Sequence, residues 1–133
     1  MNIPNKIDQT EFGTYGNCRS ACFAMLLGLS IEDVPNFESG RDYMSLRAFQ
    51  EQITLWLTYT GVSNFCFDVW DGWKEYIHPD QYFMAIIPSN LGEEYEHCVV
   101  YKGAELFYDP MPGNVTSKEI KQISLLVPLL LVS

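Results

Sequence analysis

The stretch "GNCRSACFAMLLGL" (residues 16–29) joins a helix start to an apolar helical face. Apolar side chains recur at steps of three and four, which is typical of a helix with one buried face; they are Ala21, Cys22, Met25, Leu26 and Leu29. Gly28 is a common type of C-terminal stop. The pattern predicts a helix that begins near Cys18 and ends by Gly28 or Leu29, which places Cys18 in the first turn.

Two further helical segments are expected before the midpoint of the chain. "SIED" (residues 30–33) has the form of a capping box and predicts one short turn that Pro35 limits. A longer helix is expected from about residue 45 to residue 60, with Gly61 as its stop. Its apolar positions share one face, and they are Leu46, Phe49, Ile53 and Leu57.

The second half of the chain changes to a period of two, which is typical of strands. Aromatic and β-branched residues favour strands at 63–70, 82–88, 96–101 and 105–109, and a last strand is expected within 123–132. No repeat or linker divides the chain. We therefore predict a single α+β domain over residues 1–133, with N-terminal helices packed on a C-terminal antiparallel sheet.

The chain is acidic, with 8 Lys and Arg against 17 Asp and Glu and a net charge of −9. This balance argues against binding to nucleic-acid phosphates or to anionic membranes. No signal peptide is recognised, and the apolar C-terminal run is too short to span a bilayer. A cytoplasmic protein is expected, in which the four cysteines serve chemistry or metal binding more often than disulfides.

Cys18 is a candidate nucleophile because a helix N-terminus stabilises a thiolate and lowers its pKa. A thiolate nucleophile also needs a histidine and a group that orients it. His78 lies in a polar turn, whereas His97 begins the strand "HCVVY", which reads as one arm of a hairpin. With a three-residue loop, 102–104, His97 stands opposite Asp109, and Cys98 points to the other face as a core residue.

These residues together resemble a known family. "GNCRSACFAMLLGL", a distant "HCVVY" and then "FYDP" are similar to papain-like cysteine peptidases, especially small bacterial and phage members akin to bacteriocin-processing (double-glycine) peptidases. The resemblance implies a thiol hydrolase, acting as a peptidase, isopeptidase or amidase on a peptide or protein substrate. It assigns Cys18 as nucleophile, His97 as general base and acid, and Asp109 as orienter, with no metal or organic cofactor.

The family also places a glutamine before the cysteine, where its side chain joins the cysteine's backbone N–H in an oxyanion hole. Gln9 is the only upstream glutamine, and its nine-residue distance from Cys18 requires the intervening loop to fold back. Asn17 is the other candidate donor.

Three alternatives remain open. A zinc site would use Cys18, Cys22, His97 and Cys98, although the four-residue step between the first two is unlike a metal knuckle. A catalytically inactive scaffold would bind a protein or ligand, with "DVWDGWKEY" (68–76) as a candidate surface. The same triad could instead transfer its acyl group to an amine. Loops 36–44 and 68–80 are expected to set substrate choice.

Overall fold

A computed structural model describes residues 3–89, 92–113 and 119–129 of the chain. Two helices, α1 (Cys18–Leu27) and α2 (Leu46–Tyr59), precede all of the strands. The strands are β1 (Val62–Asp68), β2 (Tyr82–Ser89), β3 (Gly92–Lys102), β4 (Glu105–Tyr108) and β5 (Gln122–Pro128). Short 3-10 turns η1 (Ile31–Asp33), η2 (Phe37–Tyr43) and η3 (Trp73–Glu75) lie between these elements. The predicted order of helices first and strands second is confirmed.

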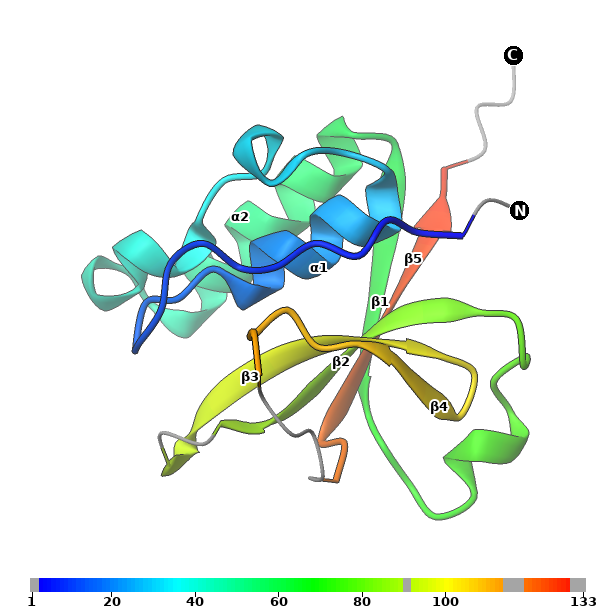
Figure 1. Cartoon of the computed structure of the whole chain (residues 1–133). Coiled ribbons are helices and arrows are strands. Elements are labelled where there is room, and N and C mark those ends of the chain that lie inside the picture. The colour runs from blue at the N-terminus through cyan, green and yellow to red at the C-terminus, as the bar shows by residue number, and fades with distance from the viewer. Residues whose placement is uncertain (1–2, 90–91, 114–118, 130–133) are drawn as a thin grey trace.

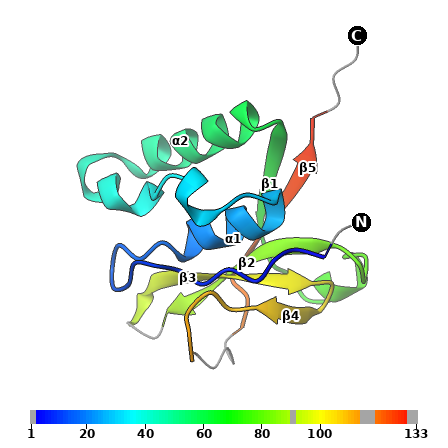
Figure 2. The ribbon, with the colours of Figure 1, turned by 45° about the horizontal axis from the view of Figure 1, so that its top comes forward.

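The strands form one antiparallel sheet in the order β1-β5-β2-β3-β4. The last strand therefore inserts between β1 and β2, as the red arrow in Figure 1 shows. Helix α1 packs on β2 and β3, and α2 packs on β1. Both helices lie on the same side of the sheet, which is clearest in the turned view of Figure 2. The predicted class, helices packed on an antiparallel sheet, is thus observed.

Apolar side chains form one core on each face of the sheet. The core on the helix side contains Cys18, Cys22, Phe23, Leu57, Cys98 and Val100 among others. The core on the opposite side contains Phe83, Ala85, Ile87, Val99 and Ile123. Segment 68–80 covers this second core through Val69, Trp73 and Ile77.

The helix boundaries agree with the expected ones, with two local corrections. Leu46 is 71% exposed, because the first turn of α2 extends past the core that covers Phe49, Ile53 and Leu57. The "SIED" turn forms, but the Ser30 hydroxyl donates to the Asp33 carboxylate at 2.9 Å and caps no backbone N–H. At α2 the Ser45 side chain does cap, accepting from Ala48 N.

The β3–β4 hairpin differs from the predicted one by one residue. Its loop is Gly103 and Ala104, since Lys102 pairs with Glu105 and Tyr101 with Leu106. A two-residue loop alone would place His97 and Asp109 on opposite faces. However, a bulge at Phe107 shifts the next pair to Val100–Tyr108, which moves the register by one more residue in the same direction. The bulge restores the common face, so the side chains of His97 and Asp109 meet, although the predicted register that set the two residues directly opposite each other is wrong.

No helix in the described part of the chain has the length and apolar character required to cross a membrane.

Candidate active site

Cys18 is the first residue of α1, immediately after the N-cap residue Asn17. The apolar face that predicts the helix also buries this end of it, and Cys18 is only 8% exposed. The free N–H groups and the positive end of the helix dipole lie at this position. A sulfur placed here is therefore stabilised as a thiolate.

His97 and Asp109 form the second half of the site. His97 Nε2 lies 2.7 Å from Asp109 Oδ1, and both side chains are about nine-tenths buried, at 12% and 8% exposed. Asp109 Oδ1 also accepts from Met111 N at 2.9 Å, which fixes the carboxylate. Because Nε2 is engaged by Asp109, Nδ1 is left to exchange a proton with Cys18.

The imidazole of His97 and the thiol of Cys98 both contact the Cys18 sulfur. Cys98 also donates its backbone N–H to Cys18 Sγ at 3.4 Å. The alternation along β3 places Cys98 in the helix-side core, as predicted. Because α1 lies on that face, the core position of Cys98 also brings it against Cys18, which was not predicted from the sequence.

The environment favours a thiolate–imidazolium pair. The pKa of Cys18 is lowered well below the ordinary thiol value, first by the hydrogen bond from the Cys98 thiol and then, against the effect of burial, by His97. Burial would lower the pKa of His97, but hydrogen bonds to Asp109 and Cys18 raise it to about 9. The pKa of the Cys98 thiol is raised by its bond to Cys18 and by burial, so Cys98 stays protonated.

Gln9 lies at this site despite its distance in the sequence. Its backbone N–H donates to Pro110 O at 2.9 Å, next to Asp109, and its side chain is 5% exposed. Its Nε2 donates to Glu11 O at 2.9 Å, while Oε1 is buried with no hydrogen-bond partner among the described residues. The loop before Cys18 folds back as the prediction required, and Gln9 is not an ordinary surface residue.

Asn17 holds this folded-back loop against the helix start. Its Oδ1 accepts from the backbone N–H groups of Thr10 and Glu11, both at 2.9 Å, and its Nδ2 donates to Thr10 Oγ1. Gly16 permits the close approach, since a Cβ there would lie 2.9 Å from Glu11 O and 3.1 Å from Gln9 Nε2. We therefore assign Asn17 to positioning, and Gln9 remains the candidate oxyanion donor.

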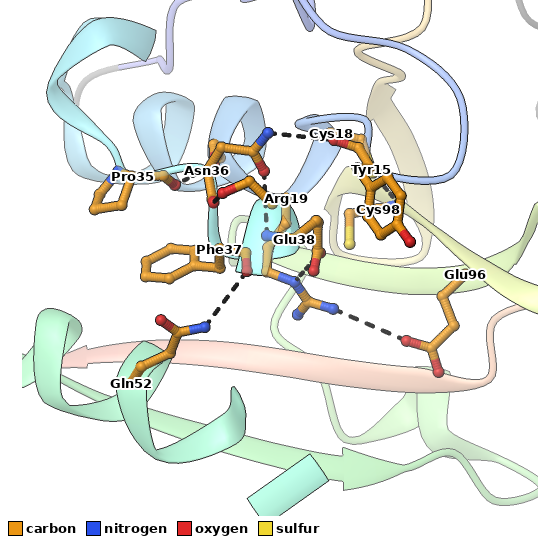
Figure 3. A network of polar contacts seen from close by, with 12 residues as sticks. Tyr15, Cys18, Arg19, Pro35, Asn36, Phe37, Glu38, Gln52, Glu96 and Cys98 are labelled. Carbon is orange, nitrogen blue, oxygen red and sulfur yellow. Dashed lines mark hydrogen bonds and ion pairs between the residues drawn. The ribbon is translucent and has the colours of Figure 1, made fainter. Parts of the chain in front are cut away.

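Arg19, which follows the nucleophile, was not anticipated from the sequence. Its Nε bonds Glu38 Oε1 at 2.9 Å, its Nη2 lies 3.9 Å from Glu96 Oε2, and its guanidinium lies over the Phe49 ring. Figure 3 shows the contacts of Arg19 with Glu38 and Glu96 in the neighbourhood of Cys18 and Cys98. Arg19 thus links the residue before His97 to segment 36–44. The sequence feature that could have identified Arg19 is a cationic residue in the first turn of an otherwise apolar helix.

The other candidates lie apart from this site. His78 is exposed, and its Nδ1 accepts from Asp80 N in a local turn. Cys66 is exposed on β1, which β5 and β2 separate from β3. Within residues 3–89, 92–113 and 119–129, no group of three or more His, Cys, Asp and Glu side chains could hold a metal ion.

Comparison of the chain with family models, curated proteins and solved structures gives no match.

The ion pair should be visible in the pH dependence of stability. The His97 contribution is full below its ordinary pKa of 6.5 and is lost as pH rises through about 9. The Cys18 contribution is full above an ordinary thiol pKa of about 8.5 and is lost as pH falls through the lowered value. Their sum is therefore level between about pH 6.5 and 8.5 and falls on either side.

Urea unfolding of the wild type and of the Cys18→Ala/His97→Ala double variant measures this contribution. The difference in unfolding free energy should be largest near pH 7.5 and smaller near pH 5 and pH 9.5. An equal difference at all three pH values would contradict the ion pair.

Proposed function

We propose that this chain is a thiol hydrolase of papain-like type that cleaves peptide, isopeptide or other amide bonds. The observation that carries the proposal is the convergence of three buried groups from separate elements. Cys18 comes from the start of α1, His97 from β3 and Asp109 from the position just after β4, in contact in that order. The arrangement has the nucleophile, base and orienter needed for acyl transfer.

The reaction follows from the atoms in contact. The Cys18 thiolate attacks the carbonyl carbon, and His97, protonated at Nδ1, gives that proton to the leaving amine as the C–N bond breaks. The acyl group is left as a thioester on Sγ. Water then attacks the thioester with His97 as base, which releases the acid and regenerates the thiolate.

Charge on the carbonyl oxygen develops beside the helix start. The Cys18 backbone N–H belongs to the first turn of α1 and has no acceptor within the helix. We assign the Gln9 carboxamide as the second donor, since it lies next to Gly16. Two such donors stabilise the oxyanion of the tetrahedral intermediate.

Of the two segments expected to select the substrate, 36–44 is adjacent to the site through Glu38 and Arg19. Its Asp42 also accepts a hydrogen bond from the Tyr15 hydroxyl, in the loop just before Cys18. Segment 68–80 instead packs on the opposite face of the sheet. We therefore propose that 36–44 alone shapes substrate choice.

A binding role is the second candidate function, carried by a different surface. Trp70 and Tyr76 are 45% and 75% exposed, and their ring centroids lie 5.7 Å apart. Exposed aromatic pairs of this kind are common at interaction surfaces. Such a role would survive Cys18→Ala, whereas hydrolysis would not.

An activated acyl ester tests the proposed function without a known substrate. With p-nitrophenyl acetate we expect acylation of Cys18 followed by steady turnover, both absent in Cys18→Ala. Cys66→Ala, which removes an exposed thiol outside the site, is the matched control and should turn over normally. Acylation without turnover, relieved by an added amine, would favour the acyltransferase. No acylation of Cys18 would refute the proposal.

A further inference from the structure

Cys98 is the feature that the proposed hydrolysis leaves unexplained. Hydrolysis needs one thiol, yet a second one contacts the nucleophile from the neighbouring strand. The two residues are 80 apart in the sequence, and Cys98 N lies 3.4 Å from Cys18 Sγ. Figure 3 shows them side by side, and both belong to the same buried core. A valine or alanine would fill such a core position without adding chemistry.

The two thiols differ in how they meet the solvent. Cys18 is 8% exposed and is the more acidic of the pair, whereas Cys98 is 1% exposed and protonated. A small oxidant therefore reacts first at Cys18, because the thiolate is the reactive form. Cys98 is buried from solvent, and its backbone N–H bonds the Cys18 sulfur, so the oxidised Cys18 is the partner presented to it.

The other cysteines are poorly placed to compete. Cys22 lies one turn along α1, and side chains at that spacing have Cβ atoms about 5–6 Å apart, beyond the usual range of about 3.5–4.5 Å for a disulfide. Cys66 lies on β1, with β5 and β2 between it and β3.

We propose that Cys18 and Cys98 form an oxidative modification site, in which a hydroperoxide converts the pair to an intramolecular disulfide and so blocks the nucleophile. This inference goes beyond the proposed hydrolysis and does not depend on any substrate. It depends only on a reactive thiolate with a thiol in contact.

The chemistry occurs in two balanced steps. The Cys18 thiolate takes one oxygen from the hydroperoxide as the O–O bond breaks, and the second oxygen leaves as water or an alcohol after gaining a proton. The sulfur is thereby oxidised to a sulfenic acid and the peroxide is reduced. Cys98 sulfur then attacks Cys18 sulfur, the S–O bond breaks, and the hydroxyl leaves with the Cys98 proton as water.

Mass mapping of the full chain tests the proposal. The reduced protein is treated with one equivalent of hydrogen peroxide near pH 7, the remaining thiols are alkylated, and the digest is analysed. We expect a peptide pair that joins Cys18 to Cys98 with loss of two hydrogen atoms, and its reversal by dithiothreitol. A link between other cysteines, or no oxidation at Cys18, would overturn the proposal.

The Cys98→Ser variant sharpens the result, since it preserves size and removes the second thiol. Dimedone should trap the Cys18 sulfenic acid in this variant, and irreversible sulfinic acid should form about tenfold faster than in the wild type. Cys22→Ala removes another buried cysteine from the same core and should keep the Cys18–Cys98 disulfide. Equal sulfinic acid formation in wild type and Cys98→Ser would also overturn the proposal.

These experiments distinguish a failure of the variant to fold, a failure of the disulfide proposal and a failure of the proposed hydrolysis. Circular dichroism of the reduced variants shows whether Cys98→Ser folds, and if it does not, the wild-type and Cys22→Ala maps still decide the question. A protein that forms the disulfide but never hydrolyses an ester would keep this inference and lose the proposed function. A protein that hydrolyses the ester but forms no Cys18–Cys98 disulfide would keep the proposed function and lose this inference.

Discussion

Near pH 6, iodoacetamide should alkylate Cys18 about 10²-fold faster in the wild type than in His97→Ala. A thiol with a pKa of about 8.5 is about 0.3% ionised at this pH, whereas the lowered pKa of Cys18 increases its ionised fraction. The largest cause of the lowered pKa, the Cys98 hydrogen bond, remains in this variant, but removing His97 takes away a second hydrogen bond and a positive charge, while burial continues to oppose ionisation. The lower intrinsic nucleophilicity of an acidic thiolate reduces the difference somewhat.

The measurement is the alkylation rate of the Cys18 peptide between about pH 5 and pH 10, followed by mass spectrometry. The His78→Ala variant is the matched control, because His78 is exposed and bonds only within its own turn in the described structure. Its profile should be that of the wild type. A wild-type rate that rises only near the ordinary thiol pKa would mean that the contacts around Cys18 do not activate it.

Local patterns in the sequence predict both α-helices and all five strands, although β3 begins at Gly92 rather than at 96 and the segment 36–44, expected as a loop, contains η2. The three- and four-residue apolar steps of residues 16–29 locate α1 to within a residue or two, and Ser45 marks the start of α2. Leu46 is the exception, because it lies on the predicted apolar face of α2 but is exposed. A pattern gives the face of a helix, but only the tertiary structure determines how far the core extends along that face.

The site was predicted in its main residues and missed in its supporting ones. His97 and Asp109 lie in one hairpin, so a local argument could bring them together, even though the loop is one residue shorter than predicted and the bulge was not predicted. The contacts of Cys98 with Cys18, and of Arg19 with Glu38, span 80 and 19 residues. They depend on how α1 is seated on β3, which no local pattern encodes.

Gln9 is an intermediate case. The resemblance to papain-like peptidases suggested it, and the spacing made its position uncertain, because nothing in "TEFGTYGN" alone indicates a folded-back loop. The structure supplies the reason in three neighbouring features. Asn17 bonds the backbone at Thr10 and Glu11, Gly16 leaves space for the Gln9 amide, and Gln9 N–H bonds Pro110 O.

Substitution of Asp109 should also have a large effect on ester turnover. Two variants separate the contribution of its negative charge from that of its hydrogen bonds. In Asp109→Ala, His97 loses the acceptor for Nε2–H, so the imidazole is free to rotate away from Cys18. Ester turnover should then fall by about 10²-fold or more. In Asp109→Asn, a carboxamide oxygen can still accept from both His97 Nε2 and Met111 N, the two donors that Oδ1 now serves. Orientation is kept and only the negative charge is lost.

The two variants should therefore differ in kind. Asp109→Asn should retain most of the turnover, while the upper limb of its pH–rate profile, near pH 9 in the wild type, moves to lower pH because the carboxylate no longer raises the pKa of His97. The sign follows from losing an opposite charge, which always favours the neutral imidazole. Asp80→Asn, an exposed acid bound near His78, serves as the control and should leave the profile unchanged. If Asp109→Asn were as inactive as Asp109→Ala, the carboxylate charge itself would be required, and orientation would no longer explain the role of Asp109.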